Sequence, residues 1–417
     1  MRQPMRTLAA RYVFPVEGTP ILDGSLSIAD GRIVRVGPAL EGPPVDDDLG
    51  NVAITPGFVN AHTHLELEPI APSVGSGPED EVGWLRRVVE ARRTSRPGSG
   101  AEAARRNVQA SVAAGTTLLA DVTTAGQSWE AVAEAPLRGV VFAELIGLNR
   151  KRGMETSAQA FDWLAKVRTE DPEAKTRPGL SPHAPYSTAG WLYHRAATSQ
   201  LPLMTHLAEM PEELELLRER AGPLRAFLED LGAWDEDWEP IGDRPAAYIR
   251  KGELRQADWI VAHANYFDPD EFWQLRPEAA PDGQRVAVVY CPRTHARFGH
   301  SPHPYRAMLE RGIIVALGTD SLASSPTLSV LDEMRFLHRL DESASGQLLL
   351  TMATLFGAWA LRSEDFTGSM KLGKSADLAV VELPDRHEAD PYALLLDSDL
   401  PVVATLYQGE FVHGAWS

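Results

Sequence analysis

Two histidines in this chain are spaced so that they could bind one metal ion. His62 and His64 are separated by a single residue and directly follow an apolar run at Gly57–Ala61. Side chains two residues apart on a β-strand point to the same face, so both imidazoles could reach one cation. Pairs with this spacing also arise by chance, so the pair alone indicates only a candidate ligand site.

Other potential ligands stand at the ends of further apolar runs. These are His206 after Leu203–Thr205, His263 after Trp259–Ala262 and Asp320 after Ile314–Gly318. Imidazole and carboxylate groups suit zinc or ferrous iron, and no cysteine stands in a pattern that suggests a structural thiolate site. We therefore expect a divalent cation where these runs end.

Glu209 could move protons beside that cation. It lies three residues after His206, about one turn away if a helix begins there. Such a carboxylate could take a proton from an activated water and pass it to a leaving nitrogen. The alternative is a helix N-terminal glutamate that interacts only with the helix dipole.

The elements that must position these residues alternate along the middle of the chain. Apolar runs are separated by segments rich in helix-forming residues, such as Ala101–Ala114 and Ala208–Arg220. Eight runs fit strands: Gly57–Ala61, Thr116–Asp121, Val140–Ile146, Gly179–Ser181, Leu203–Thr205, Trp259–Ala262, Val286–Tyr290 and Ile314–Gly318. They span about 260 residues, close to the roughly 250 typical of an eight-fold α/β barrel, whose active sites lie where the strands end. The sequence thus predicts an α/β fold of the (β/α)8 TIM-barrel type; the alternative is an open doubly wound sheet.

The two ends of the chain have a different sequence pattern from the middle. Residues Thr7–Ala53 resemble short strands broken by turn dipeptides, and the far end contains β-rich runs. The turn signals are Asp23-Gly24, Asp30-Gly31 and Gly409, and the late β-rich runs are Ala376–Leu383 and Val402–Val412. We expect β structure at both ends of the barrel segment.

Two predicted connections are too long to be simple helices. They are Leu65–Gly100 and Met210–Ala257, and both would rise from the carboxyl ends of strands. Long connections at that face of a barrel commonly form lids or binding loops. The alternative for each is a solvated excursion on the surface.

Composition excludes several classes of partner. The 417 residues contain 40 lysines and arginines against 58 aspartates and glutamates, a net charge of −18, which disfavours binding to nucleic acid. The N-terminal residues lack the apolar core of about 7 to 15 residues found in secretory signals, and there is no run of about 18 apolar residues, so we expect a cytoplasmic protein with no membrane partner.

The single cysteine, Cys291, excludes an intrachain disulfide and is interpreted as a small buried filler. A homodimer is the default expectation because twofold symmetry is common.

The sequence resembles the amidohydrolase superfamily of metal-dependent hydrolases at the residues described above. The matching segments, in order, are Thr55–Leu65, Ser181–Ser187, Thr205–Glu209, Ala262–His263, Gly318–Ser321 and Gly373–Val381. They are distributed over nearly the whole chain. The most similar branch is that of the cytosine deaminases, guanine deaminases and triazine hydrolases.

The resemblance implies a role for each residue of the metal site. His62, His64, His206 and Asp320 would be the ligands of one divalent metal ion, with zinc favoured and iron the alternative. Glu209 would be the proton shuttle, and His263 and Asp320 would help to orient and activate water. Binuclear relatives carry a modified lysine at the end of strand four, but no lysine lies between Lys175 and Lys251 here, so we expect a single metal.

The resemblance also implies the domain organisation. A small β-sandwich domain would contain residues 1–56 and 366–417, and the barrel would contain residues 57–365.

The resemblance also suggests substrate contacts, and the chain departs from the family pattern only after strand seven, where many relatives carry an asparagine following ProArgSer and this chain has Arg293 and His295. His183, Arg293 and His295 are candidates, although His183 could be purely structural and Arg293 and His295 could serve packing or ion pairs. Glu66 and Trp84, in the first long connection, resemble pocket-forming positions, with loop packing as the alternative.

The resemblance implies hydrolysis of a carbon–nitrogen bond outside a peptide. We expect hydrolytic deamination of a small amino-substituted heterocycle such as a purine, pyrimidine or triazine. The alternatives are opening of a cyclic amide, displacement of another leaving group on the same scaffold, and a non-catalytic binding relative.

Overall fold

The computed structural model describes residues 5–71, 80–167, 174–276 and 284–415. Its centre is one parallel sheet of eight strands in the order β13-β12-β11-β10-β9-β8-β7-β6. The strands are β6 (Phe58–Thr63), β7 (Thr116–Thr123), β8 (Arg138–Leu145), β9 (Thr176–Pro182), β10 (Leu203–Leu207), β11 (Trp259–His263), β12 (Val286–Tyr290) and β13 (Ile314–Leu317). All eight predicted strands are present, and the predicted TIM-barrel class is confirmed.

Contacts between the first and last strands close the sheet into a barrel. The Asp320 backbone N–H donates to the His62 carbonyl at 3.1 Å. Thr63 and Asp320 also form an isolated parallel β-bridge. Asn60 and Thr319 exchange two hydrogen bonds, from Nδ2 to Oγ1 at 2.8 Å and from the Thr319 N–H to Oδ1 at 3.1 Å. The backbones approach so closely that a Cβ on Gly318 would lie 3.0 Å from the His62 backbone nitrogen, so glycine is required there.

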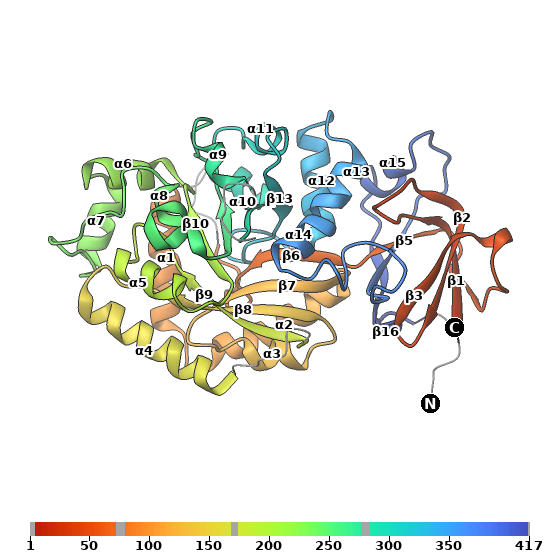
Figure 1. The fold of residues 1–417 in the computed structure, drawn as a ribbon, viewed down its shortest axis with the longest axis horizontal. Coiled ribbons are helices and arrows are strands. Elements are labelled where there is room, and N and C mark those ends of the chain that lie inside the picture. Colours follow the sequence, from red (N-terminus) through yellow and green to blue (C-terminus); the bar gives the residue numbers. More distant parts are fainter. Residues whose placement is uncertain (1–4, 72–79, 168–173, 277–283, 416–417) are drawn as a thin grey trace.

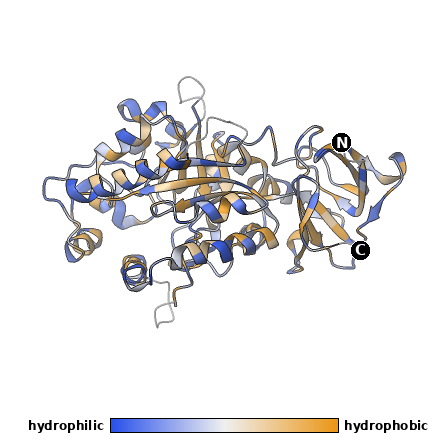
Figure 2. Cartoon of the chain, turned by 90° about the horizontal axis from the view of Figure 1, so that it is seen from below, coloured by the Kyte–Doolittle hydropathy of each residue, from blue (hydrophilic) through white to orange (hydrophobic). Residues whose placement is uncertain are grey.

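Helices follow the barrel strands and surround the sheet (Figure 1). They are α1 (Glu81–Thr94), α2 (Ser99–Ala113), α3 (Trp129–Glu134), α4 (Arg150–Val167), α5 (Gly190–Ala197), α6 (Pro211–Glu219), α7 (Pro223–Asp230), α8 (Ala247–Arg250), α9 (Phe272–Leu275), α10 (Pro292–Phe298), α11 (Tyr305–Leu309), α12 (Val330–Leu340), α13 (Gly346–Met352) and α14 (Leu355–Ala360). Figure 2 shows largely apolar strands inside and polar residues on the outer helix faces. Within the described residues, no helix is long and apolar enough to cross a membrane.

The interior of the barrel is filled by side chains from alternate strand positions. Val59, Leu118, Phe142, Ile260 and Val289 belong to one buried apolar cluster. The interior of the barrel is therefore a packed apolar core, and the polar residues at the strand ends lie next to it.

Both ends of the chain form a second, mixed sheet beside the barrel (Figure 1). Its path is β16-β15-β14-β5-β1-β2-β3, and β4 pairs with β1. The strands are β1 (Arg6–Val13), β2 (Ile21–Ala29), β3 (Arg32–Pro38), β4 (Asp47–Asp48), β5 (Val52–Pro56), β14 (Leu378–Glu382), β15 (Val402–Tyr407) and β16 (Glu410–His413), with α15 (Pro391–Leu396) between β14 and β15. The domain boundaries at residues 56/57 and 365/366 stay a prediction.

Two of the three predicted turns are present in this sheet. Asp30 and Gly31 join β2 to β3 with φ of 49° and 71°, and Gly409, with φ of 81°, lies between β15 and β16. The turn predicted at Asp23-Gly24 is wrong, because both residues lie inside β2, where Gly24 pairs with Ala10 of β1 and Pro38 of β3.

Candidate active site

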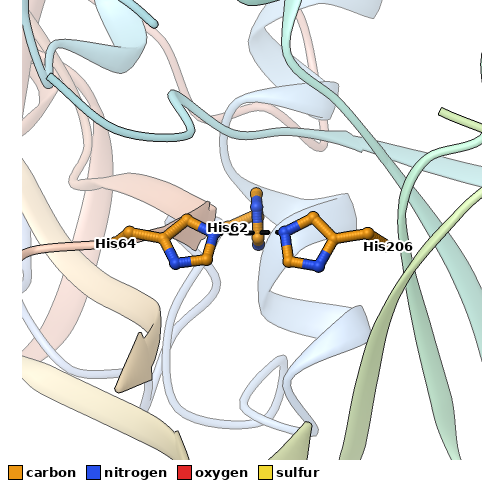
Figure 3. Close-up of side chains that lie close together, drawn as sticks. All are labelled: His62, His64 and His206. Atoms are coloured by element: carbon orange, nitrogen blue, oxygen red, sulfur yellow. Dashed lines mark hydrogen bonds between the residues drawn. The ribbon is translucent and has the colours of Figure 1, made fainter. Parts of the chain in front are cut away.

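Three histidines converge at the carboxyl ends of the barrel strands (Figure 3). His62 lies at the end of β6, His64 directly follows this strand and His206 lies in β10, and all three are buried. One ring nitrogen from each lies within 4.8 Å of the other two, and Nε2 of His64 is 3.1 Å from Nε2 of His206. The predicted strand-end geometry brings these imidazoles together from positions more than 140 residues apart in the sequence.

Hydrogen bonds orient two of the rings so that Nε2 faces the centre of the cluster. His206 Nδ1 donates to the His183 carbonyl at 3.0 Å, and His62 Nδ1 lies 3.1 Å from the Met204 sulfur. Burial lowers the pKa of His206 to about 3, and burial together with the neighbouring imidazoles lowers the pKa of His62 well below its usual value. These rings are therefore neutral, and their Nε2 lone pairs are available to a cation.

Asp320 adds a carboxylate to the cluster. Its Oδ1 lies 3.7 Å from Nε2 of both His62 and His64, and its Oδ2 accepts a hydrogen bond from Ser324 Oγ at 2.6 Å. Burial raises the pKa of Asp320 to about 7. Within the described residues, the buried His62 Nε2 has no hydrogen-bond partner. Three imidazole nitrogens and one carboxylate oxygen around such an orphaned atom fit a divalent cation.

Glu209 lies beside this cluster, although not in the way the spacing suggested. Helix α6 begins at Pro211, so Glu209 precedes it and the expected helical turn from His206 is absent. Glu213 positions this segment, because its carboxyl group accepts hydrogen bonds from the backbone N–H groups of Ala208 at 2.8 Å and Glu209 at 3.4 Å. Burial and the neighbouring carboxyl groups raise the pKa of Glu209 well above its usual value.

His263 faces Glu209 from the end of β11. Its Nε2 lies 3.1 Å from Glu209 Oε1. The His263 carbonyl accepts a hydrogen bond from His303 Nε2 at 2.7 Å, and the His303 ring stacks on Tyr290 at 4.0 Å. His303 thus fixes the backbone that carries His263.

Three residues of the site have left-handed backbone conformations. Ala208 has φ of 53°, His263 of 70° and Asp320 of 56°. Non-glycine residues rarely adopt such angles, and they are concentrated at functional sites where the surrounding structure holds them. The strain here follows from turning each chain sharply at a strand end.

A cavity of about 680 Å³ opens above the cluster. Its lining includes His64, His206, Glu209 and Asp320. Apolar side chains from both long connections line its walls, among them Trp84 and Val88 of α1 and Phe227 and Leu228 of α7. Residues 72–79 of the first connection lie outside the described residues.

Two of the predicted substrate contacts line this cavity. Trp84 does so with its indole N–H donating to the Ala323 carbonyl at 3.0 Å, and His183 does so with Nδ1 2.6 Å from Ser187 Oγ. Burial lowers the pKa of His183 to about 3, so it presents a neutral ring.

The other three predicted contacts are not among the lining residues. Glu66 accepts hydrogen bonds from Thr123 and the Thr124 N–H, Arg293 Nε donates to Glu333 at 2.7 Å, and His295 Nε2 donates to the Ser301 carbonyl at 2.9 Å. Their substrate roles stay a prediction, and each side chain already has a protein partner.

Several supporting residues had no motif by which the sequence could reveal them. Glu213 supports the site through the backbone N–H groups of Ala208 and Glu209. Arg92 and Glu144, 3.5 Å apart, both line the cavity but stand on α1 and β8. The serines after Asp320 were the one available signal, since a hydroxyl near a metal-site carboxylate is a common support.

Comparisons with known proteins agree with this arrangement. The amidohydrolase family model matches residues 53–412. A 5-methylthioadenosine/S-adenosylhomocysteine deaminase of Moorella thermoacetica is 28% identical over 91% of this chain and 86% of its own. An aminodeoxyfutalosine deaminase of Deinococcus radiodurans is 28% identical over 76% of this chain and 75% of its own. The structure of an adenosine deaminase from Xanthomonas campestris with bound zinc has the same fold, with a TM-score of 0.76 and 22% identity over 98% of this chain and 92% of its own.

His206→Ala is expected to abolish tight metal binding, because it removes one of the converging nitrogens. Elemental analysis after dialysis measures the metal per chain, with His387→Ala, an exposed histidine, as the control. Full metal content in the His206 variant would exclude His206 as a ligand.

Glu213→Ala is expected to lower the free energy of unfolding by about 1–3 kcal/mol, because it leaves buried backbone N–H groups without acceptors. It should also reduce turnover while retaining the metal, since Glu209 loses its support. Thermal denaturation and metal analysis measure both effects, with exposed Glu219→Ala on the same helix as the control. Unchanged stability would contradict the capping role.

Proposed function

The chain belongs to the amidohydrolase family, and from this premise we propose that it deaminates an amino-substituted purine nucleoside by hydrolysis. The observation that carries the proposal is that Glu209, the neutral imidazole of His206 and Asp320 line the same large cavity. The curated relatives described above are named as deaminases of adenosine-type or related compounds.

The proposed metal site consists of His62, His64, His206 and Asp320. No lysine is found among the described residues that line the cavity, which supports one cation, and the nitrogen-rich donor set supports zinc. A divalent cation bound there would lower the pKa of a water towards about 7 and so supply a nucleophile at neutral pH. The predicted cytoplasmic location and homodimer stay predictions.

The residues of the chain would then manage the protons of the reaction. Water adds to the carbon that bears the amino group, forming a C–O bond, and ammonia leaves as the C–N bond breaks. Glu209 takes a proton from the water and gives it to the ring nitrogen, then carries the second water proton to the leaving amine. His263, 3.1 Å from Glu209, orients that carboxyl group and the attacking water.

The cavity favours a substrate larger than a heterocycle alone. Its volume of about 680 Å³ lies in the range of about 300–1,000 Å³ that holds drug-sized ligands. The apolar walls formed by Trp84, Val88 and Phe227 suit an extended substituent on the nucleoside. Opening of a cyclic amide, another displacement and a binding-only role stay as alternatives.

A substrate panel tests the reaction. We expect the zinc-loaded enzyme to release ammonia from adenosines with a substituent on the ribose, faster than from cytosine or guanine. Ammonia is measured directly, with dihydropyrimidine and chlorotriazine probes for the alternatives. Production of only a ring-opened acid or chloride would overturn deamination, and a chain without tightly held metal would favour the binding-only role.

Glu209→Gln is expected to retain the metal and the fold but reduce kcat by at least the roughly 10² to 10⁴ typical of acid–base groups, because the amide cannot carry protons. Steady-state kinetics on the best substrate measures this loss. Wild-type turnover in this variant would remove Glu209 from the mechanism.

A further inference from the structure

The wall of the cavity contains a buried carboxyl group that the proposed reaction does not use. Glu144 is the next-to-last residue of β8, two positions after Phe142, which belongs to the apolar cluster inside the barrel. Because alternate residues of a strand point to the same face, the Glu144 side chain also lies on the interior side, where it lines the cavity. The side chain is only 4% exposed.

Within the described residues, no group donates a hydrogen bond to the Glu144 carboxylate. Arg92 Nη1 lies 3.5 Å from its Oε2 and forms an ion pair, and His183 Nε2 lies 3.8 Å from its Oε1. Both separations are longer than the about 2.7–3.2 Å of a hydrogen bond from nitrogen to oxygen. Burial of a carboxylate without donors costs free energy, so its position at a cavity wall indicates a ligand that supplies them.

Three separate elements hold these groups around one part of the cavity. His183 directly follows β9, and its Nδ1 is hydrogen-bonded to Ser187 Oγ at 2.6 Å, which leaves Nε2 on the side of Glu144. Arg92 lies in the last turn of α1 and lines the same cavity. Glu144 lies between them, with one oxygen towards each partner.

This set lies next to the proposed metal site. The centroid of the His183 ring is 4.8 Å from that of His206, and the His183 carbonyl accepts a hydrogen bond from His206 Nδ1. Glu144 is therefore separated from the metal site by about the width of one imidazole ring. A group bonded directly to the reacting heterocycle is the part of the substrate that reaches Glu144.

The chemistry of the set favours hydroxyl groups. A carboxylate only accepts hydrogen bonds and a guanidinium only donates them, whereas a hydroxyl does both. The two oxygens of Glu144 can accept from two adjacent hydroxyl groups, and Arg92 can donate to the oxygens of the same hydroxyls. A cationic group is disfavoured, because Arg92 offsets the charge of Glu144 and because Arg93 and Arg152 also line the cavity.

We propose that Glu144, with Arg92 and His183, binds the vicinal hydroxyl groups of a sugar attached to the heterocycle, so that the enzyme selects ribonucleosides over 2′-deoxyribonucleosides. This inference rests on the proposed function and names the residues that select the sugar. Glu144 contacts the substrate away from the reacting carbon and takes no part in the proton transfers.

Comparison of adenosine with 2′-deoxyadenosine tests the proposal. For the zinc-loaded wild type we expect kcat/KM to be at least about 100-fold higher for adenosine, because the deoxy sugar leaves an oxygen of a buried carboxylate without its donor. Glu144→Ala should lower kcat/KM for adenosine and bring the ratio of the two values close to one. Glu134→Ala, at an exposed position, is the control and should leave the ratio unchanged. Equal values for the two nucleosides in the wild type, or a wild-type ratio in Glu144→Ala, would overturn the proposal.

Glu144→Gln is a second variant that keeps the size of the side chain. It should retain the metal and the melting temperature but reduce the ratio at least about tenfold, because its amide nitrogen cannot accept a hydrogen bond. Metal content and melting temperature are measured for every variant. Loss of the metal in Glu144→Gln, or a ratio that stays at the wild-type value, would contradict a role in sugar binding.

Inosine gives a readout that does not depend on deamination, since it has no amino group to lose. In isothermal titration calorimetry with the zinc-loaded wild type, we expect the dissociation constant to be at least about tenfold lower for inosine than for 2′-deoxyinosine. Glu144→Ala should remove this difference. Equal dissociation constants, or no binding of either nucleoside, would refute the sugar site. If inosine binds with the expected preference but no panel compound is deaminated, the proposed function fails while the sugar site stands.

Discussion

Closure of the barrel between β6 and β13 is the contact on which the site depends. The Asp320 N–H bonds to the His62 carbonyl, and the Asn60 and Thr319 side chains lock the same two strands together. The first and last ligands of the proposed metal site are therefore neighbours in space, although the whole barrel separates them in sequence. A side chain larger than glycine at Gly318 would push these strands apart.

Burial has opposite effects on the two kinds of titratable group in this site. It keeps the imidazoles neutral, which leaves their lone pairs available, and it favours protonated carboxyl groups at Glu209 and Asp320. The desolvation cost is tolerated because Ser324 and the segment fixed by Glu213 hold the groups in place. A divalent cation would offset much of the remaining cost at Asp320 by pairing with its charge.

The long connections add to the barrel what the strands cannot provide. Strand ends supply the reacting groups, whereas α1 and α7 supply the apolar walls of the cavity. The rigid barrel thus carries the reacting groups, whereas the variable connections decide which substrate fits.

The sequence by itself determined the eight strands and the residues at their ends, because apolar runs and strand-end polar residues are local patterns, and it favoured a barrel; tertiary structure decided that the sheet closes, because the Asp320 N–H bonds to the His62 carbonyl across the two end strands. It also indicated the resemblance to a family, since motifs such as His62-Thr63-His64 are contiguous. Tertiary structure decided how Glu209 is held, because Glu213 reaches back across the turn before α6 and no periodicity encodes that contact. It likewise placed Arg293 and His295 against protein partners and brought Arg92 to Glu144, since such contacts join segments whose distance depends on how the whole chain packs.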